Sequence, residues 1–148
     1  MESQKLDVEK LLTEGNTVQL PPIGYSMYPV IVPGRDKVVI APASEQDCLK
    51  RGDVVLYRRD GSVLVLHRIW KVKKDGFYMV GDNQREVEGP IRRDQIRGIM
   101  TVLVRKRREI SAQDFGYRLL TGIWLRLRPF RPYISKTVAA IKRWRKKR

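Results

Sequence analysis

Short runs of β-branched and aromatic residues, separated by turn-forming residues, constrain the fold of this 148-residue chain most strongly. Such runs favour strands, because branched and aromatic side chains pack well on a pleated surface. Between the runs lie Gly, Asp, Asn and Pro, which are typical of tight turns; Gly89-Pro90 is one such expected turn. The runs that we expect to form strands are residues 17–20, 38–40, 54–57, 63–72, 77–80 and 99–104. The sequence therefore predicts a mainly β body.

Two of the turns carry the strongest local signal for a β-hairpin. Asp60-Gly61 and Asp75-Gly76 each separate two strand-like runs, and Asp-Gly favours the tight turns that join antiparallel strands. We therefore expect the long run 63–72 to pair with a neighbour on both sides. This pairing would place His67 on a rigid element.

The apolar period changes from strand-like to helical after residue 108. One helical face collects Phe115, Leu119, Leu120, Ile123, Trp124 and Leu127. Ser111, with Asp114 three residues later, resembles an N-terminal capping box, so we expect a helix from Ser111 to Leu127. Pro129 and Pro132 interrupt it. A second apolar stripe then follows at Ile134, Val138, Ile141 and Trp144.

These patterns divide the chain into a short N-terminal helical segment (1–16), a β domain (17–108) and a basic helical tail (109–148). The length suits one domain. We find no apolar run near the roughly 18 residues that would span a bilayer, and no secretion-type N-terminus, so we expect a cytoplasmic protein. Cys48 is the only cysteine, which excludes an internal disulfide and a multi-cysteine metal site. We expect neither a cofactor nor a metal.

Charge is concentrated at the C-terminus. The net charge is +15, all acids lie at or before Asp114, and residues 117–148 hold 11 bases. Such a block indicates a surface for phosphate-bearing partners, and tryptophan beside arginine on a cationic amphipathic helix suits an anionic membrane. We therefore expect peripheral contact with the inner membrane face through residues 117–148. The alternative is that both helices dock on the β body with their bases in solvent. No zinc-finger spacing or RNP-like motif favours specific nucleic-acid recognition.

Three segments carry side chains that suit acyl-transfer chemistry: Ser26 between Gly24 and Pro29, His67 in a strand-like run, and Asp82 in a Gly-Asp-Asn turn. A hydroxyl is a poor nucleophile until a base takes its proton, and an imidazole oriented by a carboxylate can do so. Asp82 would orient His67, with nearby Glu88 as the alternative. Structural alternatives are a turn hydroxyl that bonds to local backbone and a strand histidine with a satisfied hydrogen bond.

The ordered set of Gly24-Tyr25-Ser26-Met27-Tyr28-Pro29, Arg51-Gly52-Asp53, His67-Arg68 and Gly81-Asp82-Asn83 resembles the signal peptidase I and LexA-like serine peptidase superfamily. The likeness covers residues 17–104. His67-Arg68 is similar to members that use histidine as base, where other members use lysine. The resemblance implies a fold of coiled antiparallel sheets, Ser26 as nucleophile and cleavage of peptides bound as an added strand.

We therefore expect a small serine endopeptidase that cleaves leader or signal-like peptides from a peptide or preprotein substrate. It would lack the N-terminal membrane anchor of signal peptidases and the DNA-binding part of the repressors. The alternative is a catalytically inactive module that holds an extended peptide in its β groove or nucleic acid on its basic tail. The sequence indicates no oligomeric state.

Overall fold

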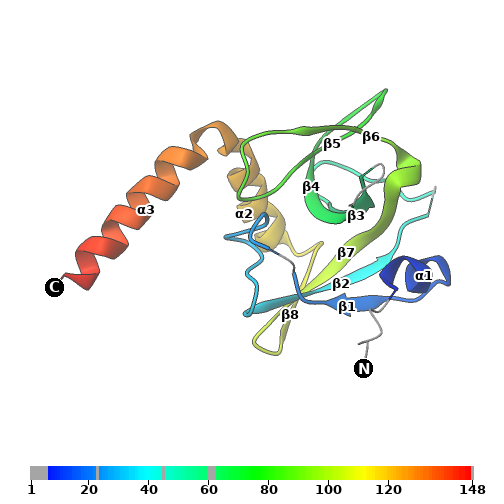
Figure 1. Ribbon diagram of the computed structural model, residues 1–148, viewed down its shortest axis with the longest axis horizontal. Coiled ribbons are helices and arrows are strands. Elements are labelled where there is room, and N and C mark those ends of the chain that lie inside the picture. Colours follow the sequence, from blue (N-terminus) through cyan, green and yellow to red (C-terminus); the bar gives the residue numbers. More distant parts are fainter. Residues whose placement is uncertain (1–6, 23, 45, 60–62, 148) are drawn as a thin grey trace.

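The β-branched runs form an antiparallel sheet in the computed structural model, which describes residues 7–22, 24–44, 46–59 and 63–147 (Figure 1). The eight strands described are β1 (Val18–Leu20), β2 (Asp36–Pro42), β3 (Val54–Arg58), β4 (Leu64–Lys73), β5 (Gly76–Val80), β6 (Glu88–Ile91), β7 (Ile96–Arg105) and β8 (Arg108–Ser111). The helices are α1 (Val8–Thr13), α2 (Phe115–Arg126) and α3 (Arg131–Lys146), with 3₁₀ turns η1 (Arg93–Gln95) and η2 (Arg128–Phe130). The predicted mainly β body is confirmed.

The sheet runs in the order β1-β2-β7-β3-β4-β5-β6, and β8 also pairs with β7. The long strand β7 connects its parts. It pairs with β2 along residues 98–105, while its other edge pairs with β3 near its start and with β8 near its end. Because β7 changes partner along its length, the sheet curves, and hydrophobic side chains pack against both of its faces (Figure 1).

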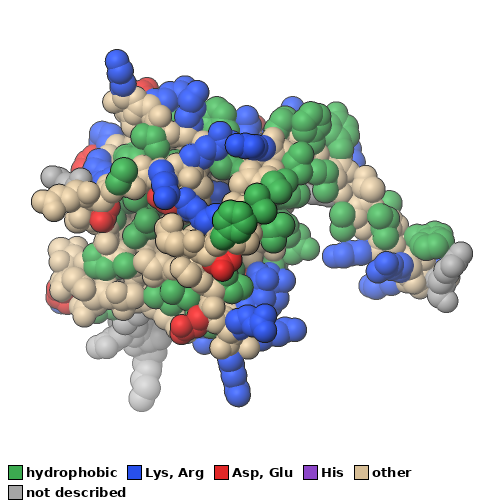
Figure 2. Space-filling model, turned by 180° about the vertical axis from the view of Figure 1, so that it is seen from behind, with side chains coloured by type: hydrophobic (Ala, Val, Ile, Leu, Met, Phe, Trp, Pro, Cys, Tyr) green, Lys and Arg blue, Asp and Glu red, His purple; other side chains and the backbone are tan. Residues whose placement is uncertain are grey.

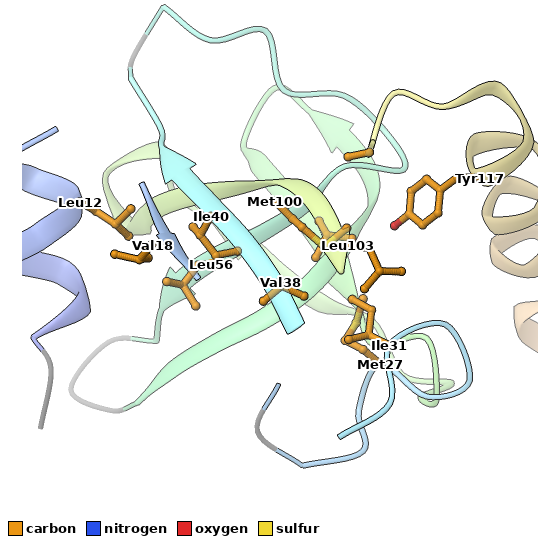
Figure 3. Packing of buried hydrophobic residues seen from close by; sticks show 12 residues of the cluster. Leu12, Val18, Met27, Ile31, Val38, Ile40, Leu56, Met100, Leu103 and Tyr117 are labelled. Carbon is orange, nitrogen blue, oxygen red and sulfur yellow. The ribbon is translucent and has the colours of Figure 1, made fainter. Parts of the chain in front are cut away.

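Two hydrophobic clusters lie on opposite faces of the strands. Because successive side chains of a strand point to opposite sides, β3 contributes Val54 and Leu56 to the first cluster and Val55 and Tyr57 to the second. The first cluster also contains Leu12, Val18, Met27, Ile31, Val38, Ile40, Met100, Leu103, Ala112 and Tyr117 (Figure 3). The second also contains Leu49, Ile69, Met79, Ile91 and Ile96. The strand β3 is thus buried on both faces, which explains its continuous apolar run.

The strand that carries His67 is paired on both edges, as the sequence predicts. β4 pairs with β3 on one side and with β5 on the other. In the first pairing His67 lies opposite Val55, and in the second Arg68 lies opposite Val80. The Asp75-Gly76 hairpin is confirmed, whereas the turn expected at Asp60-Gly61 lies outside the described residues.

Two predicted boundaries are wrong. Gly89-Pro90 was expected as a turn but lies within β6, at the edge of the sheet; proline fits an edge strand because it needs no ladder partner for an N–H. The helix expected from Ser111 begins at Phe115, because Ser111 pairs with Val102 at the end of β8. Asp114 is the N-cap instead, and its carboxylate accepts a hydrogen bond from the backbone N–H of Tyr117.

The helix α2 packs on the body with the face opposite to its apolar stripe. Tyr117, Thr121 and Leu125 are buried, whereas four residues of the stripe are exposed: Phe115, Leu119, Leu120 and Ile123. Of the body's two ends, α1 covers one through Leu12 and α2 covers the other through Tyr117 (Figure 3).

The second predicted helix, α3, is confirmed, and it projects away from the β body (Figure 1). Pro129 lies in η2 and Pro132 in the first turn of α3, where a missing N–H leaves no helical bond unmade. Among the described residues, no helix is long and apolar enough to cross a membrane.

Candidate active site

Ser26 lies in a turn, residues 24–31, that is anchored in the core. Met27 and Ile31 are buried in the first cluster. The carbonyl oxygen of Ser26 accepts a hydrogen bond from the backbone N–H of Asn83 at 2.8 Å. Gly81 has no room for a side chain, since a Cβ there would lie 2.5 Å from that same carbonyl oxygen. The structure therefore brings two of the three predicted segments, the Ser26 turn and the 81–83 turn, into direct contact.

The polar groups of Ser26 that could act on a ligand are unoccupied. The side chain is half-buried, and neither its hydroxyl nor its backbone N–H makes a hydrogen bond to any described residue. The hydroxyl is thus not used to close the turn. It is also not hydrogen-bonded to His67, a bond that in ligand-free sites often forms only when substrate binds.

His67 is buried in β4 and belongs to a chain of hydrogen bonds. Only 3% of its surface is exposed. Its Nδ1 lies 3.1 Å from the hydroxyl oxygen of Tyr57, and this hydroxyl donates to Glu88 Oε2 at 2.9 Å. Arg59 in turn donates two hydrogen bonds to the Glu88 carboxylate, each of 2.8 Å. The chain Arg59–Glu88–Tyr57–His67 thus runs from the surface to the imidazole.

These hydrogen bonds determine which ring nitrogen of His67 carries the proton. Burial alone would raise the pKa of Glu88, but hydrogen bonds from Arg59 and Tyr57 bring it below its usual value, so the carboxylate is ionised at neutral pH. An ionised carboxylate only accepts. The single proton of Tyr57 therefore points to Glu88, and the oxygen of Tyr57 accepts from Nδ1–H of His67. A neutral imidazole has one such proton, so Nε2 is left with a free lone pair.

The imidazole is neutral over a wide pH range. Burial lowers the pKa of His67 from 6.5 to about 4, partly opposed by the charge of Glu88 and assisted by that of Arg59. Burial also raises the pKa of the Tyr57 phenol, which stays protonated. The site therefore contains an uncharged base at physiological pH, the state needed to accept a proton.

The pH titration of His67 is expected to have its midpoint well below 6.5. Burial disfavours the imidazolium, so the ring is protonated only as pH falls toward about 4. The chain has one histidine, so its ring C–H signals in proton NMR report this residue alone. A midpoint at 6.5 or above would show that the ring is solvated and would contradict the buried network.

Asp82 makes no hydrogen bond to His67, although its charge, like that of Glu88, acts to raise the pKa of His67. Both oxygens of Asp82 accept hydrogen bonds from Arg68, each of 2.8 Å, and both side chains are buried. Arg68 is adjacent to His67 in β4 and so points to the opposite face. Its guanidinium also donates to the carbonyl of Gly52 at 2.9 Å and lies over the ring of Tyr117. The contacts of Asp82 are thus those of a structural anchor for the 81–83 turn.

The alternative carboxylate, Glu88, does reach His67, but through Tyr57. Sequence reasoning identifies neither Tyr57 nor Arg59 as a site residue. Tyr57 contacts the ring because the β3–β4 register sets Val55 opposite His67, and Tyr57 follows two residues later on the same face. This spacing is the only signal in the sequence, and it is informative only once the register is known.

Two hollows lie near these residues. One, of about 500 Å³, is lined by Arg59 and residues 84–88. The other, of about 700 Å³, lies between the end of the Ser26 turn at Pro29, the strand β8, and Leu120 and Trp124 of α2. The second hollow lies directly beside the Ser26 turn.

Comparison with known proteins assigns no family to this chain. No protein-family model matches it, and no curated protein matches it significantly.

Proposed function

We propose that this chain is a serine endopeptidase of the signal-peptidase-like class, with Ser26 as nucleophile and His67 as general base. The observation that carries the proposal is the free Nε2 of His67. Nδ1 is held by Tyr57. Nε2 has no hydrogen-bond partner among the described residues, and because it is not among their buried unbonded atoms, it is open to solvent and to a ligand.

The position of Ser26 supports the same role. Its turn is held against residues 81–83 by the bond from Asn83, while its hydroxyl and backbone N–H are both unbonded within the described chain. A free hydroxyl and a free N–H on one residue are what a nucleophile with its own oxyanion donor requires. The eight-stranded antiparallel sheet is compatible with the coiled-sheet fold of the superfamily that the motifs resemble, and we propose that fold for the β domain.

The proposed reaction begins when the scissile carbonyl lies against Ser26. His67 Nε2 accepts the hydroxyl proton as Ser26 Oγ forms a bond to the carbonyl carbon, and the Ser26 N–H donates to the developing oxyanion. The tetrahedral intermediate collapses, the C–N bond breaks, and Nε2–H gives its proton to the leaving amine. Water then attacks the acyl-enzyme by the same route, with His67 again accepting and returning the proton.

In this proposal, Tyr57 and Glu88 orient His67 and stabilise its charged form, the role that a carboxylate has in a Ser-His-Asp triad. During the reaction His67 becomes an imidazolium inside the protein, which burial makes costly. The Tyr57 oxygen accepts from Nδ1–H throughout, and the Glu88 charge, which raises the pKa of His67, stabilises the imidazolium. Both are positioning residues, because they act on the substrate only through His67.

The proposed substrate is an extended leader or signal-like peptide of a preprotein. An extended peptide can pair with a free sheet edge, and the described sheet ends at β1 on one side and β6 on the other. The hollow beside Pro29 and Trp124 would receive a side chain next to the bond that Ser26 attacks.

Labelling with a fluorophosphonate probe tests the nucleophile without knowledge of the substrate. The wild-type chain is expected to be labelled, because the probe phosphonylates an activated serine, and Ser26→Ala is expected to abolish labelling. Ser44→Ala is the matched control, since Ser44 is exposed and lies outside the Ser26 turn. Labelling is read by in-gel fluorescence and by the mass of the modified peptide.

Two outcomes would contradict the proposal. Labelling of Ser26→Ala to the wild-type level would show that another residue reacts. A wild-type chain that stays unlabelled, while a known histidine-type relative is labelled under the same conditions, would favour the inactive peptide- or nucleic-acid-binding module.

A further inference from the structure

The outward face of α2 is apolar although it is largely exposed. Phe115 is 81% exposed and Leu120 69%, and Leu119 and Ile123 are about half exposed. The helix is already docked through its other face, which buries Tyr117, Thr121 and Leu125. A surface helix normally places polar side chains on its solvent face. This helix instead has an apolar face left over after packing.

The helix α3 adds a second apolar face with basic residues opposite. Its apolar side chains recur at helical spacing, and Tyr133, Val138, Ile141 and Trp144 are each 45–70% exposed. The opposite side carries Lys136, Lys142, Arg143 and Lys146 together with Ala139, whereas Arg145 lies beside the apolar stripe, one helical turn after Ile141. In Figure 2, hydrophobic side chains follow one side of the projecting helix and basic side chains lie on the other.

The charge of these helices selects the kind of partner. No acid occurs from Phe115 to the end of the chain, and residues 117–148 hold 11 bases. A second copy would bring two strongly basic surfaces together, which repel. Nucleic acid would be bound by the basic side and would leave the apolar faces in water. An anionic bilayer fits both the basic side and the apolar faces, because its headgroups attract the bases and its hydrocarbon region accepts the apolar side chains.

We propose that the outward faces of α2 and α3 form one docking surface for an anionic lipid bilayer. The surface consists of Phe115, Leu119, Leu120, Ile123, Phe130, Tyr133, Val138, Ile141 and Trp144, flanked by the bases of α3. The helices lie in the interface plane, with apolar side chains at the boundary between headgroups and acyl chains. The surface is held to the β domain, because α2 packs on it through Tyr117, Thr121 and Leu125.

The position of α2 links this surface to the Ser26 turn. Leu120 belongs to the outward face and also lines the hollow that begins at Pro29. Trp124, in the next turn of α2, lines the same hollow and donates a hydrogen bond of 2.7 Å to the carbonyl of Asp82. Docking through α2 therefore holds the Ser26 turn near the lipid surface. The docking itself does not depend on any catalytic role of Ser26.

Flotation of the full chain with lipid vesicles tests the surface. We expect binding to vesicles of phosphatidylcholine with 30% phosphatidylserine, in about 0.1 M salt, and at least tenfold weaker binding to phosphatidylcholine alone. Lys142→Gln/Arg143→Gln/Lys146→Gln is expected to weaken binding by about fivefold per base removed. Matched substitutions on the β body, at Lys37, Lys74 and Lys106, are expected to change binding less than twofold.

Separate variants test the contribution of the apolar side chains of the docking surface. Phe115→Ser/Leu119→Ser, on α2, is expected to weaken binding to anionic vesicles at least tenfold, because the charge is unchanged and only apolar contact is lost. Val72→Ser is the control, since Val72 is exposed on β4. The circular dichroism spectrum of each variant is expected to match that of the wild-type chain, which shows that the variant is folded. Ser26→Ala is expected to bind vesicles as the wild-type chain does, so a failed peptidase assay would not affect this result.

Several outcomes would overturn the proposal. Equal binding to neutral and anionic vesicles would show that charge has no role. Wild-type binding by Phe115→Ser/Leu119→Ser would show that α2 is not part of the docking surface. Tight binding of an oligonucleotide that depends on the bases alone, with no vesicle binding, would identify a nucleic-acid surface. A dimer in sedimentation that dissociates in the α2 variant would identify a second copy as the occupant.

Discussion

Replacing His67 with glutamine is expected to lower peptide turnover to the residual rate of Ser26→Ala, a loss on the order of 10⁴- to 10⁶-fold. Glutamine keeps a polar group near Tyr57 but cannot accept the proton that must leave the Ser26 hydroxyl. A nucleophile and its base act as one unit, so losing either removes the same rate enhancement. The measurement is kcat/KM on a peptide that the wild-type chain cleaves, together with thermal unfolding of each variant.

The double variant Ser26→Ala/His67→Gln provides the sharper test. It is expected to be no slower than either single variant, because nothing remains for the second change to remove. Tyr57→Phe is expected to give an intermediate loss, on the order of 10²-fold, since His67 stays but its Nδ1–H loses the acceptor that holds it. Losses that multiply in the double variant would show that the two residues act independently, and would contradict the proposed mechanism.

The strands with continuous or alternating apolar runs are predictable from the sequence because their side chains pack on the sheet. Residues 54–57 and 63–72 fall within or close to β3 and β4. The pairing of β4 with β5 follows from the local turn signal at Asp75-Gly76. The strand β6 was missed because Gly89-Pro90 is a strong local turn signal, and only pairing with β5 makes it a strand. Residues 108–111 were missed because the mostly polar β8 has no apolar run of its own.

The apolar stripe of α2 was predicted correctly as helical, and the sequence left open whether the stripe meets the β body or a membrane. Periodicity identifies an apolar face and cannot say what covers it. In α2 the body instead packs on Tyr117, Thr121 and Leu125. Thr121 is satisfied within the helix, because its hydroxyl donates to the carbonyl of Tyr117, so a face with a polar residue could be buried.

In the candidate site, too, the sequence pattern identifies some residues, whereas others are recognised only once the strand register is known. Ser26 and His67 stand out in the sequence because the chemistry needs those residue types. Their supporting residues do not, since Tyr57 reaches His67 through strand pairing and Glu88 reaches it through Tyr57. Asp82 stands out for a local reason, a Gly-Asp-Asn turn, and its carboxylate binds Arg68.

Replacing Asp82 with asparagine is expected to lower the free energy of unfolding by about 3–5 kcal/mol. The change leaves the guanidinium of Arg68 buried without its counter-charge, and this side chain has no exposed surface. For a chain of this length, such a loss lowers Tm on the order of 10 °C. The measurement is thermal and urea unfolding. Asp94→Asn is the matched control, expected within about 0.5 kcal/mol, because its ion pair with Arg92 is exposed.

The same variant separates the two carboxylates that the sequence left as alternatives. Glu88→Gln is expected to reduce turnover while costing less stability than Asp82→Asn, because Glu88 is partly exposed. Asp82→Asn is expected to keep most of its turnover at a temperature where it remains folded. If Asp82→Asn instead keeps its Tm and loses turnover by 10²-fold or more, then Asp82 orients His67 and the assignment from Tyr57 and Glu88 fails.

Removing both partners of the buried pair distinguishes an unpaired charge from a lost attraction. Arg68→Met/Asp82→Leu leaves neither charge in the core, so it is expected to be more stable than Asp82→Asn, although Arg68 would no longer bind the Gly52 carbonyl. Turnover of the double variant is expected to stay near that of Asp82→Asn, because the backbone N–H of Asn83 that holds the Ser26 carbonyl is unchanged in both. Recovery of stability together with a loss of turnover of 10²-fold or more would mean that the pair also places the 81–83 turn, and with it Ser26, in the geometry for attack.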